Sequence, residues 1–514
     1  MSTFQGLEMS KRALYAQQGA LYTTGHNISN VNTDGYSRQR VDFNTTPSFP
    51  KAAKMMPGGA GQKGTGVEIG VIERIRNKFL DTQYRTENSN MGYWSTRQNA
   101  LSRMESLMNE QSKDGLQATM DNFWESLQDL SNEPEDSGAR SVVAERGLAV
   151  AETFNHLSRE LGKIKGDLKD EINDTADKIN GLLDGINNIN KQIKKIEPHG
   201  QLANDLYDER DRLLDELSGY VNIEVTYEDS AESALDIADG IAVINMVDRN
   251  GNNIANLLNE DDMNLDKIEG RIKVEPSNEE GKLSDSYVSH ISIDGHDENI
   301  QFDDFNKTGS LSALIETYGY GNNADSVEGD YPEILEDLNN MAAAFAKEFN
   351  EVHASGEDLN GEAGGDFFVS TDGNITASNI TVNRDLLDNP SLIAATDPNN
   401  GGKNGDNASN LAKVFDKDIE IKEGEDEVSI RKFYKSVIGK IGVNGAEAKR
   451  NVDNTAILQN KVDESRKSIS AVSLDEEISN LVKFQHAYNA AARNMTTVDE
   501  MLDRIINQMG LVGR

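Results

Sequence analysis

Apolar residues recur at every seventh position near both ends of this chain of 514 residues. Near the start, the repeated positions are Leu7, Leu14, Leu21 and Ile28. Near the end, they are Leu474, Leu481, Tyr488, Met495, Leu502 and Met509. An apolar repeat of seven predicts a helix with a coiled-coil seam. Since neither helix can bury its seam alone, the pattern predicts that the two terminal helices pack on each other or on neighbouring copies.

The same stripes also fit two amphipathic helices that lie on an ordinary globular core. The C-terminal repeat continues over six positions, however, whereas an average helix of a globular protein has about 11 to 12 residues. We therefore favour a seam and assign these ten positions to an assembly interface.

The middle of the chain predicts more helices and a few strands. Residues 75 to 219 have a helical pattern, and the apolar positions from Leu161 to Ile196 have a mean period of about 3.5, which indicates a second coiled coil. Pro198 and Gly200 end this helix and a leucine-rich helix follows, so about 150 to 219 is expected to form an antiparallel hairpin. The runs 221–227, 241–247 and 289–295 have the composition of β-strands. Helical patterns resume near Tyr331 and after residue 430.

These elements predict a multidomain protein that is mainly α with some β. Residues 1–62 and 455–514 are expected to form a terminal α-helical coiled-coil domain for assembly. Residues 63–219 and 306–454 are expected to form a rod-like second domain, a helical bundle or mixed, that contains the hairpin. Residues 220–305 are expected to form a small antiparallel β domain that faces outward.

The charge of −37 is unevenly distributed along the chain. Residues 1–85 carry 11 Lys+Arg and 6 Asp+Glu, and residues 449–514 carry 9 of each, so the middle carries 31 against 73, a net −42. Because like charges repel, self-association is expected through the ends, with the acidic middle facing solvent. The same acidity argues against nucleic acid or an anionic membrane as a partner.

No long apolar segment is found in the sequence. No stretch approaches the roughly 18 apolar residues of a membrane span. Glu8, Lys11 and Arg12 interrupt any apolar core of a secretory signal. If the protein is exported, we therefore expect a route that uses no cleaved signal.

Little in the sequence points to catalysis or to a cofactor. Cysteine is absent, and the 7 histidines lack the spacing of a metal site or of a catalytic motif. Asp248, Asn250 and Asn252 alternate as in a calcium loop, but Asn259 stands where the bidentate Glu belongs, so a hairpin turn is favoured. We expect no enzymatic activity, no catalytic residue, and no bound cofactor or metal.

A cluster of turn-forming residues follows the first helix. Asn30, Asn32, Asp34, Gly35 and Tyr36 form a candidate turn motif, in which Asp-Gly favours positive φ. A plain helix-capping loop is the alternative.

Two basic residues, Arg38 and Arg40, follow this turn. Both are candidates to pair with carboxylates of a neighbouring copy, and a solvated surface position is the alternative.

The terminal helices are expected to be marginally stable in the free chain. Ordering one residue costs about 1 to 2 kcal/mol, whereas burying one large apolar side chain returns about 1.5 to 3 kcal/mol. With one anchor in every three or four residues, we expect mobile ends that fold on assembly.

Both ends of the chain also resemble flagellar axial proteins. The block LYTTGHNISNVNTDGYSRQRVDF, residues 21 to 43, is similar to the signature shared by rod, hook and hook-associated proteins. The block LDEEISNLVKFQHAYNAAARNMTTVDEMLDRIIN, residues 474 to 507, is similar to the matching C-terminal signature. Gly25, His26 and His486 depart mildly from the alanine, asparagine and arginine that are common in the family.

Internal blocks over nearly the whole chain resemble the FlgK family of flagellar hook-associated proteins. They are GTGVEIGVIERIRNKFLDTQYR (64–85), LYDERDRLLDELS (206–218), GSLSALIET (309–317) and FNEVHASGEDLNGEAGGDFF (349–368).

The resemblance implies a structural component of the bacterial flagellum that forms the junction between hook and filament. Its implied partners are further copies of itself in a ring of about eleven subunits, the hook protein, the second junction protein (hook-associated protein 3), and an export chaperone on the C-terminal region. Its implied location is the extracellular flagellum, which it reaches through the flagellar type III apparatus. Two alternatives stay open: another axial subunit, such as a rod or hook protein, and a secreted acidic hydrolase of the cell wall.

Overall fold

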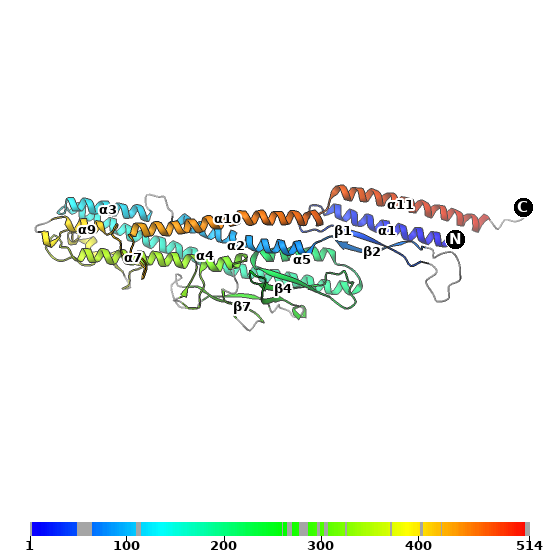
Figure 1. Cartoon of the computed structure of the whole chain (residues 1–514), viewed down its shortest axis with the longest axis horizontal. Helices are drawn as coiled ribbons and strands as arrows, with labels where there is room; N and C mark the ends of the chain where they lie inside the picture. Colours follow the sequence, from blue (N-terminus) through cyan, green and yellow to red (C-terminus); the bar gives the residue numbers. More distant parts are fainter. Residues whose placement is uncertain are drawn as a thin grey trace.

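The protein is long and mainly helical (Figure 1). The computed structural model describes residues 3–48, 64–108, 115–259, 261–264, 270–276, 286–295, 299–302, 307–323, 326–370, 373–400, 404–422 and 424–508. The first and last helices lie side by side at one end, and residues from the middle of the chain form the other end (Figure 1). The predicted fold class, mainly α with small antiparallel sheets, is confirmed.

The helices account for most of the length of the molecule. They are α1 (Thr3–Ser29), α2 (Lys78–Met108), α3 (Leu116–Asn132), α4 (Ser137–Ile196), α5 (Asn204–Tyr220), α6 (Gly309–Tyr318), α7 (Asp330–Ala354), α8 (Arg384–Asp388), α9 (Asp406–Lys413), α10 (Ile430–Ser470) and α11 (Leu474–Asp503). Short helical turns are η1 (Glu197–His199), η2 (Asp261–Asn264), η6 (Pro390–Leu392), η7 (Pro398–Asn400) and η8 (Arg504–Gln508).

The strands form small antiparallel sheets, paired as β1-β2, β3-β4-β5, β6-β7 and β8-β9 in the described residues. They are β1 (Gln39–Thr45), β2 (Val67–Arg74), β3 (Ile223–Glu228), β4 (Ile241–Val247), β5 (Asn253–Leu258), β6 (Ile272–Pro276), β7 (Val288–Ile293), β8 (Phe368–Ser370) and β9 (Ile380–Val382). Sequence patterns predicted β3, β4 and β7 but missed β1, β2, β5 and β6.

Helix α4 is the central support of the molecule, with 60 residues that contact helices on one side and strands on the other. Its predicted apolar stripe is buried, as at Leu161, Ile179 and Ile193. Near its middle, Leu183 is fully buried and Leu182 is only partly buried. Helix α5 folds back against α4, and the β strands pack on the same helix.

Three buried asparagines attach strands β6 and β4 and the helical turn η2 to α4. Asn180 donates to the backbone oxygen of Ile272 (3.0 Å) and accepts from its N–H (2.9 Å). Asn190 makes the same pair of bonds with Ala242 (2.9 and 3.2 Å), and Asn187 donates to the backbone oxygen of Asp262 (3.2 Å). A side-chain amide donates hydrogen bonds on one side and accepts them on the other. It can therefore bond both the backbone N–H and the backbone oxygen of a strand residue that lacks a neighbouring strand.

The end of the molecule opposite the termini has an aromatic core. The Phe123 ring lies 5.4 to 6.1 Å from four other phenylalanine rings. These are Phe349, Phe367, Phe368 and Phe415, all at most 1% exposed. Rings at these distances in tilted and edge-on arrangements pack favourably, so this end is held by apolar contacts within one chain.

The expected domain boundary between residues 454 and 455 falls inside α10, which continues to Ser470 and packs along α2. The other expected boundary, at residues 62 and 63, separates β1 from β2, which pair with each other. The break between the two C-terminal helices lies at Ala471–Ser473.

Candidate assembly surface of the terminal helices

Helices α1 and α11 form an antiparallel pair at one end of the molecule (Figure 1). Asn494 Nδ2 donates to Ser10 Oγ (3.1 Å), and Gly6 lies beside Val498. The sequence patterns predicted that two segments more than 440 residues apart would pack on each other or on neighbouring copies, and in this chain α1 and α11 (the terminal pair) pack on each other.

The β1-β2 hairpin covers one face of α1 with small side chains between them. Ala16, Ala20 and Thr23 are at most 4% exposed. A Cβ at Gly19 would lie only 2.3 Å from Ile69 Cδ1, so a larger residue there would displace the Ile69 side chain of β2. Small residues therefore allow the close approach of helix and hairpin.

The predicted seam residues line the helix pair without being fully buried. Only Leu502 is buried, at 8% exposed, and Leu474 is 45% exposed. The other described positions are partly buried: Leu7, Leu14, Leu21, Ile28, Leu481, Tyr488 and Met495. Met509 lies outside the described residues. The seam of one chain is therefore only partly covered by that chain.

Other large apolar side chains on the same two helices face solvent. Tyr22 is 77% exposed and Ile478 is 53% exposed. Exposed with them are Phe4, Tyr15, Val482 and Met501, and the adjoining turn η8 exposes Ile505 and Ile506. Grouped apolar exposure on a soluble protein marks an interaction surface, because single exposed residues are ordinary but clusters are costly. We call the exposed and partly buried apolar residues of α1 and α11 the terminal surface.

The predicted turn motif leads from α1 to β1. Gly35 has a φ of +77°, as Asp-Gly suggested. The Asn30 amide donates to the backbone oxygen of His26 (3.1 Å), whereas Asn32 and Asp34 are exposed. Tyr36 donates its hydroxyl hydrogen to Asn27 Oδ1 (2.8 Å).

Asn27 organises this turn although the predicted motif did not include it. It is 1% exposed, and its amide donates to the backbone oxygen of Gln39 (2.8 Å) while its oxygen accepts the Gln39 N–H (3.0 Å). Asparagines are frequent in turns, so sequence gave no means of choosing it among Asn27, Asn30 and Asn32.

A buried ionic cluster connects the β1-β2 hairpin, which packs on α1, to α2 and α5. Arg74, at the end of β2, contacts Asp208 (2.8 Å) and Asp211 (3.0 Å) of α5. Arg85 of α2 contacts Asp211 (3.2 Å) and Asp215 (3.0 Å). These side chains are at most 15% exposed, so the charges depend on one another for compensation.

Asp211 is at the centre of this cluster. Burial alone would raise the pKa of its carboxyl, but the positive charges of Arg76, Arg74 and Arg85 hold that pKa well below its usual range. Asp211 is therefore charged at every physiological pH and holds Arg74 of β2, Arg76 of the following segment and Arg85 of α2 against α5.

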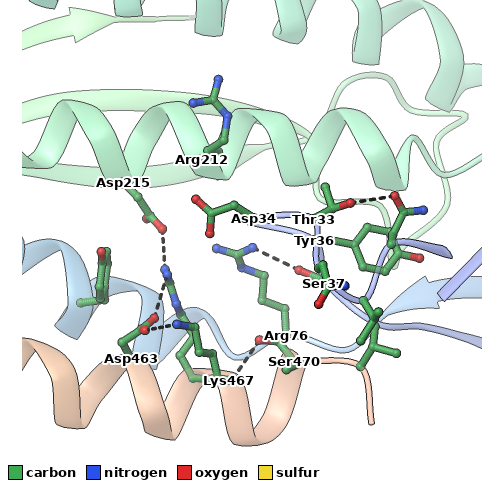
Figure 2. A pocket seen from close by; sticks show the side chains of 18 of the residues that line it. Thr33, Asp34, Tyr36, Ser37, Arg76, Arg212, Asp215, Asp463, Lys467 and Ser470 are labelled. Carbon is green, nitrogen blue, oxygen red and sulfur yellow. Dashed lines mark hydrogen bonds and ion pairs between the residues drawn. The ribbon is translucent and has the colours of Figure 1, made fainter. Parts of the chain in front are cut away.

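A polar cleft of about 670 Å³ lies beside the cluster, between the turn, α5 and the end of α10 (Figure 2). Its charged groups are largely paired with each other. Arg466 contacts Asp215, Lys467 contacts Asp463 (2.6 Å), and Arg76 donates to Ser37 Oγ (3.2 Å). The cleft is thus a solvated space where the turn, α5 and the end of α10 meet.

Within the described ranges, every helix is too short or too polar to cross a membrane. The same part of the chain holds no group of three or more His, Cys, Asp or Glu residues placed to bind a metal ion.

Known proteins resemble this chain over its full length. The model of the FlgK helical domain (flagellar hook-associated protein) matches residues 101–368, and that of the C-terminal segment of flagellar basal body rod proteins matches residues 468–509. Flagellar hook-associated protein 1 of Bacillus subtilis (strain 168) is 44% identical over 518 residues, which covers 100% of both proteins. The Escherichia coli (strain K12) protein of the same name is 24% identical, covering 96% of this chain and 98% of that protein.

A solved structure also has the same fold. The flagellar hook junction protein FlgK from Burkholderia pseudomallei superposes with a TM-score of 0.55 at 13% identity, covering 76% of this chain and 100% of that one. Together with the full-length identity to the Bacillus protein, these matches show that the chain belongs to the FlgK family of flagellar hook-associated proteins.

Proposed function

We propose that this chain forms the junction ring between hook and filament by self-assembly through α1 and α11. The observation that carries this proposal is the terminal surface, on which large apolar side chains of both helices are left partly or fully exposed by the single chain. A second copy packed against this surface would remove it from water. This burial would stabilise the assembly by about 25 cal/mol for each Å² of apolar area.

The charge distribution supports the same assembly. The middle of the chain carries a net −42, so copies arranged around a common centre would repel one another if their acidic parts were innermost. Placing the nearly neutral ends inside and the acidic middle outside avoids that repulsion. The solved neighbour is described as a hook junction protein, which agrees with this position.

The remaining partners and the location follow as proposals from the family. We expect a ring of about eleven copies that contacts the hook protein on one side and the second junction protein, hook-associated protein 3, on the other. We expect export through the flagellar type III apparatus to the extracellular flagellum, with a chaperone holding α11 before export. Shielding of an apolar surface by a chaperone would prevent premature association.

The test is electron microscopy and motility of a strain that lacks this protein, complemented with wild type or with a terminal-surface variant. Ile478→Asp is the most informative change, because Ile478 is 53% exposed in the single chain and its substitution spares the fold. Leu481→Asp tests a predicted seam position. We expect hooks without filaments in the deletion strain, rescue by wild type and no rescue by either variant.

Val142→Asp is the matched control, since Val142 is 48% exposed but lies on α4 and not on α1 or α11. It should restore filaments. Normal filaments in the deletion strain would refute the junction role, and rescue by Ile478→Asp and Leu481→Asp would refute assembly through the terminal surface.

The same micrographs separate the two other functions considered from sequence. Loss of a hook subunit removes the hook itself, whereas loss of a junction protein leaves hooks in place. The FlgK family is one of structural flagellar proteins and is not a known enzyme family.

A further inference from the structure

The two C-terminal helices are joined by a short extended break. Helix α10 ends at Ser470, Ala471 has φ −72° and ψ 154°, and Ser473 precedes α11 with φ −91° and ψ 112° and no side-chain cap. Such a break between helices of 41 and 30 residues is a point at which their angle is not fixed by helical hydrogen bonds. Other contacts must therefore set this angle.

Arg38 contacts both sides of the break. Its backbone N–H donates to the oxygen of Ser470, the last residue of α10 (2.8 Å). Its guanidinium reaches the first turn of α11, where Nη1 donates to Glu476 and Nε lies 3.7 Å from Glu477 Oε1. The backbone oxygen of Arg38 accepts the N–H of Ile75 (2.8 Å), which ties it to the segment before α2.

The ion pairs of Arg38 are partly shielded from water. The Arg38 side chain is 22% exposed and that of Glu477 is 4% exposed, whereas that of Glu476 is 60% exposed. Attraction between charges grows as the local dielectric constant falls, so the contact with Glu477 is stronger than an ordinary surface pair. Acidic residues in the first turn of α11 are also favoured by the helix dipole, which fixes Glu476 and Glu477 as acceptors.

The polar cleft of about 670 Å³ opens beside the break, and its lining includes Ser470, Ala471, Val472 and the turn residues. Figure 2 shows Ser470 and the turn residues Asp34 and Ser37 around this cleft. The contacts that hold the turn beside the break to α5 are polar, as where the Ser37 N–H donates to Asp208 Oδ2 (3.1 Å). Polar interfaces with water between them permit relative movement more readily than close-packed apolar ones.

We infer that Arg38 is a clamp that sets the angle between α10 and α11. Through this angle it sets the direction in which the terminal pair projects from the rest of the molecule. When the guanidinium is removed, the terminal pair pivots at residues 471–473 over a wider range of angles. This inference concerns the free chain and does not depend on the proposed ring.

Distance measurement by double electron–electron resonance tests the clamp directly. The chain has no cysteine, so labels at Lys449→Cys on α10 and Gln485→Cys on α11 are the only ones present. Both positions are exposed and lie on opposite sides of the break. We expect Arg38→Gln to widen the distance distribution about twofold, as expected when one state becomes several of similar energy.

Arg40→Gln is the matched control, since Arg40 is also a basic residue of this segment but pairs with Asp42 (3.2 Å) and Glu73 (2.6 Å) inside the hairpin. Its distribution should equal that of wild type. Glu477→Gln weakens the same clamp from the other side and should also widen the distribution. Circular dichroism is measured on each variant, and a change confined to the distances supports the clamp.

An unchanged distribution in both Arg38→Gln and Glu477→Gln would overturn the inference. Equal widening in Arg40→Gln would also overturn the inference, because the wider distribution would then follow from the loss of any positive charge in this segment. Failure of the flagellar complementation experiment would leave this result untouched, so the two proposals fail separately.

Discussion

The two ends of this molecule differ in how completely a single chain buries their apolar side chains. At one end, Phe123 and Phe349 are fully buried among other rings of the same chain. At the other, Phe4 is 65% exposed and the predicted seam residues are partly covered. The first end is complete in one chain, whereas the second presents unsatisfied apolar surface. We propose from this difference that assembly completes the burial of the terminal pair.

The largest expected effect is in the aromatic core. Phe123→Ala removes a ring that contacts four others and should lower the free energy of unfolding of the free chain by about 3 to 5 kcal/mol. Urea unfolding followed by circular dichroism measures this. Phe4→Ala is the control at the other end and should change stability by less than about 0.5 kcal/mol. Equal losses from the two changes would remove the contrast.

The ionic cluster between the two ends should be the next most sensitive place. Asp211→Asn leaves buried arginines without their shared carboxylate and should cost about 3 kcal/mol. Asp205→Asn is the control, because the Asp205 side chain is 71% exposed on the same helix. Unfolding curves that coincide for Asp211→Asn and wild type would show that the cluster contributes little.

The aromatic end should also be sensitive to mild acid. Burial lowers the pKa of His353, whose Nε2 accepts the Ala394 N–H (2.9 Å) and whose Nδ1 donates to the oxygen of Gly365 (2.6 Å). As the pH falls, the unfolded chain therefore binds the proton before the folded chain does. The contribution of neutral His353 to the free energy of unfolding is complete above the unfolded pKa of about 6.5. At lower pH this contribution decreases, by up to about 1.4 kcal/mol per pH unit.

Unfolding at pH 7.5 and at pH 5.5 measures this dependence. His353→Gln should flatten it, and His486→Gln, an exposed change on α11, should leave it as in wild type. If His353→Gln leaves the pH dependence of stability unchanged, that dependence comes from other titratable side chains.

The smallest effect is expected on the terminal surface of the free chain. Ile478→Asp changes a side chain that already faces water, so stability should change by less than about 0.5 kcal/mol. The same variant should abolish assembly of the purified protein, measured by sedimentation. If Ile478→Asp lowered stability strongly but left assembly intact, the terminal surface would be part of the folded core of one chain and not an assembly surface.

The helices were predictable because their apolar positions repeat. The heptads from Leu7 and Leu474 and the stripe from Leu161 to Ile193 each mark a helix that the structure contains. Burial was less predictable, as Leu183 rather than Leu182 is fully buried, since neighbours from several elements surround that part of α4.

The contacts that join distant segments could not be predicted from local patterns. Asn180 and Asn190 resemble ordinary polar positions of a helix, and only the strands beside them reveal their role. Strands β1 and β2 were missed because their partly buried positions do not alternate cleanly. Arg38 was a candidate to pair with a neighbouring copy, yet it contacts Glu476 and Glu477 of its own chain.

The central claim is that the terminal pair is only marginally stable in the free chain and is completed by assembly, and hydrogen exchange of the free chain tests it most directly. Amides of residues 5–28 and 474–506 should exchange much faster than those of α4 and α7, because their helices bury less apolar surface in one chain. Assembly should slow the exchange of both segments. Protection of both segments in the free chain equal to that of α4 would contradict the account.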